Sequence, residues 1–278
     1  TMWDAPDPSA ERSRATMWDV VRFAEQMRYD AIVVENVVEA TKWVCWPAWR
    51  QAMADLGYDS HVVSANSQDF EVAQSRDRIY VVFWRRGAVK PDLEQEREAW
   101  CHRCDSVSVC RQAWKNGRTV GRYRAQWVWG CLVCGAPCEP GKTAAATIID
   151  WSLPTPLIGE RTKPLAPKTR ERIAAGLARH GWAPITTTAL ATPPNFLFQT
   201  AHGGRVHETT EPHPTVCASD DRLSLVVGLR GTEAGQVAGS AYPECGFRML
   251  EPYEVAAAMA FPKGYIPRSY TKRDQVKL

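Results

Sequence analysis

The stretch DAIVVENVVEA, residues 30–40, decides the fold that we expect for this chain. Its apolar run is short and rich in β-branched residues, a pattern that indicates a buried strand. The run leads directly into Glu35 and Asn36. Ligands of open α/β sheets bind beyond the C-terminal ends of the strands. We therefore expect this strand to deliver a carboxylate and an amide to a binding site.

Helical and extended patterns alternate on both sides of that strand. Residues 15–30 and 46–58 have helical periodicity, and residues 168–179 predict a further helix. Residues 60–66 and 78–84 are apolar runs of strand length. Helices that alternate with apolar strands are typical of a parallel, doubly wound sheet. The sequence therefore predicts an α/β fold.

Length and composition limit the class of protein. The chain has 278 residues, of which 45% are hydrophobic, enough for one large or two modest domains with apolar cores. A net charge of +3 is too small to indicate a nucleic-acid partner by itself. No apolar run approaches the roughly 18 residues of a membrane span, so we expect no membrane partner. The chain starts without Met, and we expect both of its ends to be cut from a longer protein.

Cysteines are concentrated in one short segment, which favours an intracellular metal site over disulfides. The segment contains two Cys-x-x-Cys pairs, and four thiolates in a tetrahedral array suit Zn²⁺. The expected ligands of this structural zinc ribbon are Cys101, Cys104, Cys131 and Cys134. Cys138, His102 and Cys110 are substitute ligands, and reduced structural cysteines without metal are the alternative interpretation.

A second group of polar residues precedes the strand at residues 78–84. The sequence QSRDR, residues 74–78, places Arg76 and Arg78 two positions apart, so both side chains of an extended chain point the same way. Together with Glu35, the two guanidinium groups suit a substrate that needs a proton donor and rigid cationic donors. A solvated basic turn and a solvent-facing strand end are the alternative.

Four segments resemble ordered motifs of the cytosine-5 DNA methyltransferases. The segments are ERSRATMWDVVRFAEQMRYDAIVVENV (residues 11–37), VAQSRDRIYVV (72–82), EPHPTVCASDDRLSLVV (211–227) and FRMLEPYEVAAAMAFP (247–262). They occur in the order found in that family, with the cysteine-rich segment as an insertion. The resemblance spans nearly the whole chain. It implies a partial Rossmann-like methyltransferase sheet, double-stranded DNA as the substrate and S-adenosylmethionine as the cofactor.

The resemblance also implies roles for single residues. In the family, a cysteine thiolate adds to cytosine C6, and negative charge develops on the ring at N3 and O2. Glu35 matches the carboxyl group that donates a proton at N3, and burial would help it to keep that proton. Arg78 matches the arginine that stabilises charge at O2, Arg76 orients the loop, and Asn36 holds the backbone near the site. The target base must leave the duplex to reach them.

DNA contacts are a further expectation. The residues expected to contact DNA are Gln74, Ser75, Arg205 and Thr215. Residues 120–130 of the insertion alternate like a strand and carry basic and aromatic side chains. That strand either contacts DNA or packs against the neighbouring domain.

Two features of the family lie upstream of this sequence. The nucleophilic cysteine and the glycine-rich turn that binds S-adenosylmethionine both precede residues 11–37 in the family. Neither Cys45 nor Cys138 matches the nucleophile, so we expect the chain to be a fragment that is inactive alone, with no residue assigned to the cofactor. The rival interpretations are a non-catalytic, zinc-stabilised DNA-binding module and one half of a split methyltransferase.

The expected organisation has four parts. Residues 1–88 belong to the catalytic domain, and residues 89–142 form the zinc-ribbon insertion. Residues 143–245 form a small, irregular β target-recognition region, and residues 246–278 return to the catalytic domain with a helix over 250–262. We expect a monomer in the cytoplasm of a bacterium or a phage-infected cell, with a restriction endonuclease as a partner in a gene pair.

Overall fold

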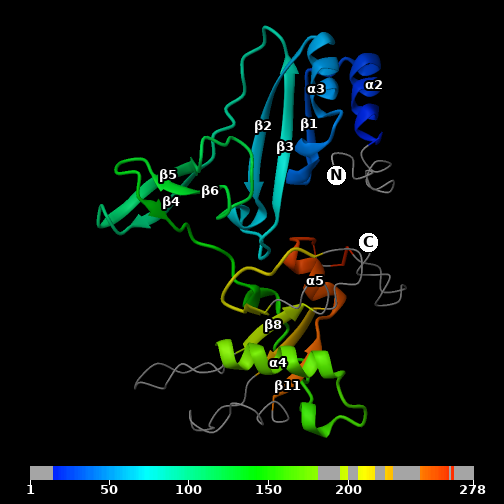
Figure 1. Cartoon of the computed structure of the whole chain (residues 1–278), viewed down its shortest axis with the longest axis vertical. Helices are drawn as coiled ribbons and strands as arrows, with labels where there is room; N and C mark the ends of the chain where they lie inside the picture. The colour runs from blue at the N-terminus through cyan, green and yellow to red at the C-terminus, as the bar shows by residue number, and fades with distance from the viewer. Residues whose placement is uncertain are drawn as a thin grey trace, which may run out of the picture. The chain divides into compact units, whose positions relative to one another are not determined.

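The structure is a computed structural model that forms two compact units (Figure 1). The first unit comprises Thr1–Asp69 and Asp77–Gly141, and the second comprises Phe70–Arg76 and Lys142–Leu278. The residues that the structure describes are 15–180, 195–199, 206–216, 223–227, 245–262 and 264–265. Within these ranges, none of the helices is long and apolar enough to cross a bilayer. The division into four parts stays a prediction.

The first unit is built on a three-stranded sheet in the order β1-β3-β2. Its strands are β1 (Ala31–Asn36), β2 (Tyr58–Asn66) and β3 (Asp77–Arg85). β3 lies between the other two strands and runs antiparallel to both, so the prediction of a parallel sheet is wrong for this strand. A parallel connection needs a crossover of about a dozen residues or more, usually a helix. The chain from β2 to β3 contains only the short turn η2 (Ser67–Phe70) and a few further residues, so it reverses direction.

Helices α2 (Met17–Met27) and α3 (Trp46–Asp55) pack on one face of this sheet, as the helical periodicity predicts (Figure 1). Trp49 is fully buried there and donates a hydrogen bond from its indole N–H to the carbonyl oxygen of Met17 at 2.7 Å. The shared core of this unit comprises Met17, Ala24, Ala40, Trp43, Trp46, Trp49, Met53, Tyr58, Ile79, Val81 and Phe83.

Strand β1 is not the buried strand that its apolar run predicts. Exposed and half-buried residues alternate along it, and Val33 is 63% exposed. Ile32 and Val34 pack against the core under the helices. The cause is position, because β1 is an edge strand with its other side chains on the face opposite to α2 and α3, within the part of the chain that the structure describes.

The cysteine-rich insertion folds as a ribbon of four antiparallel strands in sequence order. They are β4 (Glu96–Cys101), β5 (Ser106–Trp114), β6 (Trp127–Cys131) and β7 (Pro137–Cys138). The strand expected over residues 120–130 begins only at Trp127. Residues before it form a turn, because the backbone N–H groups of Gln126 and Trp127 bond back to the carbonyl oxygen of Arg122 and because Arg124 has a positive φ of 61°.

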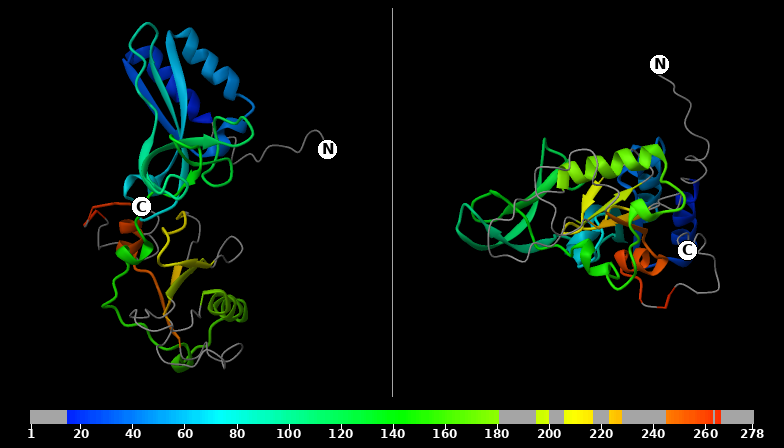
Figure 2. Two further views of the ribbon diagram at one scale, coloured as in Figure 1. Left: turned by 90° about the vertical axis from the view of Figure 1, so that its left-hand side faces the viewer. Right: turned by 90° about the horizontal axis from the view of Figure 1, so that it is seen from below.

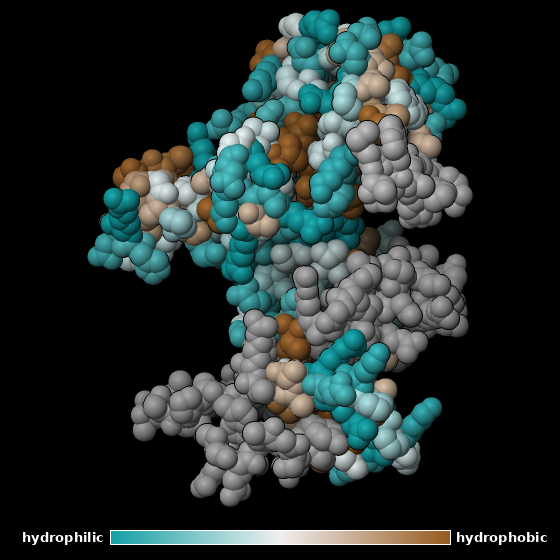
Figure 3. Space-filling view, viewed as in Figure 1, coloured by the Kyte–Doolittle hydropathy of each residue, from teal (hydrophilic) through white to brown (hydrophobic). Residues whose placement is uncertain are grey.

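The ribbon has a small aromatic core and an apolar surface. Trp127 and Trp129 are fully buried beside the cysteines. Several large hydrophobic side chains of the ribbon are exposed, and Figure 3 shows a hydrophobic patch among hydrophilic residues on this part of the surface. They are Trp100, Val107, Val109, Leu132 and Val133. A segment that buries so little of its apolar surface needs a further source of folding free energy, which a metal can supply.

The second unit contains a four-stranded antiparallel sheet in the order β11-β10-β8-β9. The strands are β8 (Asn195–Gln199), β9 (Val206–Glu208), β10 (Leu223–Val227) and β11 (Gly246–Met249). Helix α4 (Pro167–His180), which its periodicity predicts, packs against β8 and β9 (Figure 2). Gly176 lets this helix approach closely, because a Cβ atom there would lie 2.5 Å from Cε2 of Phe196.

Replacing Gly176 with alanine is expected to destabilise the second unit. The added methyl group overpacks the contact with Phe196, at a cost of about 1–3 kcal/mol, and the better helix propensity of alanine offsets about 1 kcal/mol of this. Denaturant unfolding of the two proteins measures the difference. Gly141→Ala is the matched control, because no atom lies within 4 Å of a Cβ placed there. A Gly176→Ala protein that is more stable than wild type would contradict the packing.

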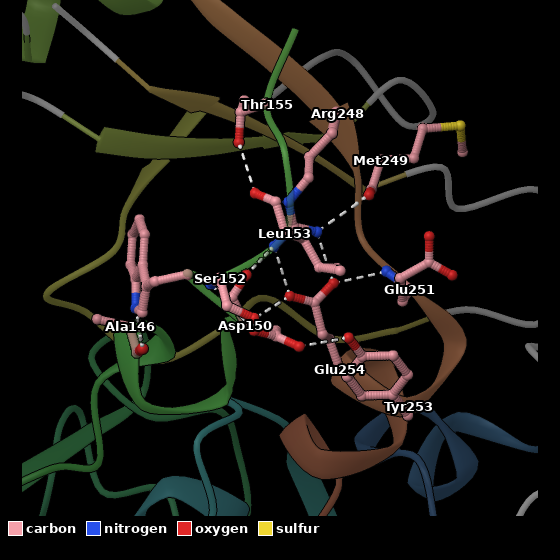
Figure 4. Close-up of polar contacts among 11 residues, drawn as sticks. Ala146, Asp150, Ser152, Leu153, Thr155, Arg248, Met249, Glu251, Tyr253 and Glu254 are labelled. Atoms are coloured by element: carbon pink, nitrogen blue, oxygen red, sulfur yellow. Dashed lines mark hydrogen bonds and ion pairs between the residues drawn. The ribbon is translucent and has the colours of Figure 1, made fainter.

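Helix α5 (Pro252–Ala258) is held by one buried carboxylate (Figure 4). Glu254 is fully buried. Each of its carboxylate oxygens accepts a hydrogen bond from one terminal nitrogen of Arg248, at 2.7 Å. The same carboxylate accepts the backbone N–H groups of Glu251 at 2.6 Å and Asp150 at 2.7 Å. Glu254 therefore joins β11, the start of α5 and the segment that contains Asp150. The helix expected over residues 250–262 is confirmed.

Candidate active site and metal centre

Glu35 and Arg78 lie next to each other at one end of the first sheet. Because β3 is antiparallel to β1, its first residues pair with the last residues of β1, with Glu35 opposite Tyr80 and Asn36 opposite Ile79. Nε of Arg78 lies 2.7 Å from Oε1 of Glu35. The structure thus brings together the carboxylate and the guanidinium that the sequence pattern singled out from separate strands.

The two members of this ion pair differ in exposure. The side chain of Arg78 is 16% exposed, whereas that of Glu35 is 48% exposed. The expectation of a buried Glu35 is therefore wrong, because Glu35 lies on the sheet face opposite to α2 and α3, where Tyr80 of the central strand is exposed as well. A ligand that covers this end of the sheet would have to exclude the water that reaches Glu35.

Asn36 holds backbone at the end of β1. Its side-chain oxygen accepts a hydrogen bond from the backbone N–H of Val37 at 2.8 Å, and its Nδ2 lies 3.6 Å from the sulfur of Met17 on α2. These contacts link the end of the strand to the helix that covers it. Through these contacts, Asn36 fixes the conformation of the backbone that follows Glu35.

Ser75 and Thr215 contact each other although 140 residues separate them. The hydroxyl of Thr215 donates to the carbonyl oxygen of Ser75 at 2.9 Å, and the backbone N–H of Ser75 donates to the carbonyl oxygen of His213 at 2.8 Å. Gln74 is buried and forms a β-bridge with His213. Three of the residues expected to contact DNA therefore meet within the second unit.

The two arginines of the QSRDR sequence make different contacts. Arg78 belongs to the first unit and pairs with Glu35. Arg76 belongs to the second unit, where its Nη1 donates to the carbonyl oxygen of Val216 at 3.4 Å. Arg205, the remaining residue expected to contact DNA, lies outside the described residues.

Asp77, between those arginines, is a further residue of the site that the sequence pattern does not single out. Its Oδ1 accepts hydrogen bonds from Nδ2 of Asn66 at 3.0 Å and from the backbone N–H of Tyr123 at 2.9 Å. Burial raises the pKa of the Asp77 carboxyl, although these hydrogen bonds and the nearby arginines act in the opposite direction. Its place inside the QSRDR motif was the available signal, but its partner on the ribbon is visible only in three dimensions.

Four cysteine sulfur atoms gather at the ends of the ribbon strands. The Sγ atoms of Cys101, Cys104, Cys131 and Cys134 all lie within 4.8 Å of one another. Two of the separations are 3.5 Å between Cys101 and Cys134 and 3.8 Å between Cys104 and Cys131. Tetrahedral zinc with Zn–S bonds of about 2.3 Å requires sulfur separations of about 3.8 Å. The donor set therefore fits a four-thiolate zinc ion.

The backbone of the two Cys-x-x-Cys turns favours thiolates. Backbone N–H groups of Cys104 and Arg103 lower the pKa of the Cys101 thiol. Those of Cys134 and Val133 lower the pKa of Cys131 to about 6. Contact with the neighbouring sulfurs and burial raise the pKa of Cys104 to about 12. A divalent cation would relieve the crowding of these thiols, which further supports a metal at this centre.

The remaining ribbon cysteines lie beside this centre. Cys110 and Cys138 are buried in the same hydrophobic cluster as Cys101 and Cys131, and each thiol donates to the backbone carbonyl oxygen two residues before it. Neither belongs to the group of four mutually close sulfur atoms. The assignment of the ligands to the two Cys-x-x-Cys pairs is therefore the one that the geometry favours.

Comparisons with known proteins point to one family. Residues 8–112 match the family model for C-5 cytosine-specific DNA methylases. Two curated relatives from Herpetosiphon aurantiacus are similar over part of the chain. The Type II methyltransferase M.HgiBI is 30% identical over 105 residues, and the Type II methylase M.HgiEI is 36% identical over 73 residues. These matches cover 34% and 25% of this chain and only 24% and 17% of the relatives.

A solved structure is similar over most of the chain but at a low level. The crystal structure of a DNMT2 mutant from Spodoptera frugiperda has a TM-score of 0.49 and 13% sequence identity. The similarity covers 93% of this chain and 64% of that one. Likeness at this level carries no information about function.

Proposed function

We propose, on the premise that the chain belongs to the cytosine-5 DNA methyltransferase family through residues 8–112, that the protein methylates C5 of a flipped cytosine in double-stranded DNA. The observation that carries the proposal is the ion pair between Glu35 and Arg78, which sets an acid and a cation side by side at the end of the sheet. S-adenosylmethionine would supply the electrophilic methyl group, and no residue of this chain is assigned to its binding.

The chemistry explains why both groups are needed. Carbon C5 of cytosine is a poor nucleophile until a thiolate adds to C6, and this addition moves negative charge onto N3 and O2. Glu35 would donate its proton at N3, and the guanidinium of Arg78 would stabilise the charge at O2. With S-adenosylmethionine bound in the intact protein, C5 would take its methyl group and S-adenosylhomocysteine would be released. Loss of the C5 proton, return of the N3 proton to Glu35 and departure of the thiolate would then restore the aromatic ring. A flipped base stacked over Glu35 would exclude water, and desolvation favours the protonated carboxyl group.

The nucleophile is proposed to lie outside residues 1–278. Six described cysteines are collected in the ribbon, where four of them form the candidate metal centre. Cys45 packs partly against the core under α2 and α3, and Cys245 is buried in the second unit. These placements give the eight described cysteines structural surroundings, which supports a thiolate from another part of the protein; Cys217 lies outside the described residues.

The second unit is proposed to contribute DNA contacts through Thr215 and Ser75, whereas Gln74 is buried beside them and is not available to DNA. The Thr215–Ser75 hydrogen bond supports this, because it orders two segments that resemble family motifs. The two relatives are named as Type II enzymes, which favours a restriction endonuclease as the partner. A monomeric state is also part of the proposal.

Methyl transfer by the intact protein tests the proposed function. Labelled S-adenosylmethionine and mixed-sequence DNA are expected to yield labelled 5-methylcytosine, and DNA already methylated at C5 should accept no label. Residues 1–278 alone are expected to be inactive. DNA binding by the intact protein without any transfer would favour the non-catalytic DNA-binding module. Turnover by residues 1–278 alone would contradict the proposed origin of the nucleophile.

A further inference from the structure

One short segment of the ribbon contacts the same end of the sheet as the Glu35–Arg78 pair. Residues 120–123 connect the ribbon strands β5 and β6. This segment forms hydrogen bonds with β2, with the start of β3 and with the turn that follows β1. The bonds run from Gly121 N to Ser64 Oγ (3.1 Å), from Tyr123 N to Asp77 Oδ1 (2.9 Å) and from Arg122 Nη2 to Glu39 Oε1 (2.6 Å).

Asp77 is the point where this segment meets the candidate active site. Its carboxylate is held by Tyr123 of the ribbon and by Asn66 of β2. Its carbonyl oxygen accepts a hydrogen bond from Nη1 of Arg78 at 2.8 Å, while Nε of the same guanidinium contacts Glu35 at 2.7 Å. An uninterrupted set of contacts therefore leads from the ribbon through Asp77 to Arg78 and Glu35.

The interior of the ribbon connects this segment to the candidate metal centre. The ring of Tyr123 packs on Trp127 at a centroid distance of 4.9 Å, and Trp127 packs on Trp129 at 5.5 Å. These aromatic residues form one cluster with Cys101 and Cys131. Loss of the metal should therefore loosen the packing that places the N–H group of Tyr123.

We propose that Asp77 is a positioning residue for Arg78 and that the metal-bound ribbon holds Asp77 in place through the backbone of Tyr123. The importance of this positioning for catalysis rests on the proposed function, in which Arg78 meets cytosine O2. An arginine side chain has many rotamers, and two fixed acceptors restrict its guanidinium to one orientation before the substrate arrives. The insertion would then hold the side chains of the active site in a fixed arrangement.

Hydrogen exchange at Nε–H of Arg78 tests the positioning without any need for activity. The measurement uses ¹⁵N-labelled residues 1–278 in solution, with the Arg78 signal assigned by its loss in Arg78→Lys. Asp77→Ala is expected to raise the exchange rate about tenfold, the effect of one lost hydrogen-bond network. Asp77→Asn keeps an oxygen that can accept both hydrogen bonds, so its rate should stay within about twofold of wild type.

Arg85 provides the internal control for this measurement. Its Nε lies 3.0 Å from Asp30 at the opposite end of β3, so its exchange rate should not change in Asp77→Ala. An unchanged Arg78 rate would overturn the proposal. Equal increases at Arg78 and Arg85 would also overturn it, because they would mean general loosening of the sheet.

Removal of the metal by a chelator tests whether the ribbon helps to position Arg78. The exchange rate at Arg78 should rise as in Asp77→Ala while the rate at Arg85 stays constant, and an unchanged Arg78 rate would overturn the coupling.

In the intact protein, Asp77→Ala is expected to lower kcat about 10- to 100-fold with little change in KM for DNA, and Asp77→Asn should restore most of the lost kcat. Full activity of Arg78→Ala would refute the proposed function, while the exchange results would still decide the positioning.

Discussion

Glu35→Gln is expected to slow methyl transfer by the intact protein about 10²–10⁴-fold, the usual cost of removing a general acid. Glutamine retains the shape of the side chain and an oxygen that can accept the N–H of Arg78. Its amide N–H can donate a hydrogen bond to N3 of the target base but cannot transfer a proton, so negative charge on the ring would not be neutralised. Single-turnover methylation of one defined duplex measures the effect on the chemical step.

A matched variant separates this effect from loss of an ion pair. Asp59→Asn removes a carboxylate of β2 with similar exposure, 46%, whose partner Arg86 lies at 3.5 Å in the turn after β3. We expect this control to methylate DNA within about twofold of wild type, since exposed ion pairs contribute little to stability. DNA affinity should be nearly constant in both variants, because phosphate contacts supply most of it. A Glu35→Gln protein as fast as the control would remove Glu35 from the mechanism.

Cys104→Ser is expected to release the metal and to unfold the ribbon over residues 96–138. Structural zinc contributes about 10–16 kcal/mol to the folding of small zinc domains, and the ribbon has little apolar core to replace that contribution. Wild-type protein purified without added zinc should contain about one equivalent. Metal analysis and limited proteolysis of the two proteins would show the loss of zinc and the new cleavage sites.

Cys110→Ser is the control that tests the ligand set. Cys110 is buried in the same cluster but is not one of the four close sulfur atoms, so this variant should keep its zinc. Zinc that survives in Cys104→Ser and is lost from Cys110→Ser would show that the ligands are assigned wrongly. Protein that contains no metal in the wild-type form would favour reduced structural cysteines.

Several parts of this fold could be predicted because their signals are local. Hydrophobic periodicity predicts α2, α3 and α4, since one face of each helix has to pack against a core. The proline and the capping glutamates of α5 likewise lie within one turn of the helix. The spacing of the two Cys-x-x-Cys pairs predicts four sulfur atoms in one place, because each pair forms its own short turn.

Other features depended on which segments become neighbours. An apolar run shows that Ile32 and Val34 will be covered, but it does not show that β1 is an edge strand with Val33 and Glu35 exposed. The antiparallel direction of β3 follows from the short connection that precedes it. Glu254 has the sequence surroundings of an ordinary helix surface residue, yet it is fully buried against Arg248.

The sequence by itself determined the helices, the four-thiolate cluster and the residue types that meet at the end of the sheet. Only the tertiary structure decided that Glu35 pairs with Arg78, that Ser75 meets Thr215 across 140 residues and that Tyr123 of the ribbon holds Asp77. The physical reason is range. Periodicity, capping and ligand spacing act within a few turns of the chain. The hydrogen bonds and the ion pair named above instead form between segments that are distant in sequence, and they require that strand order and direction are already settled.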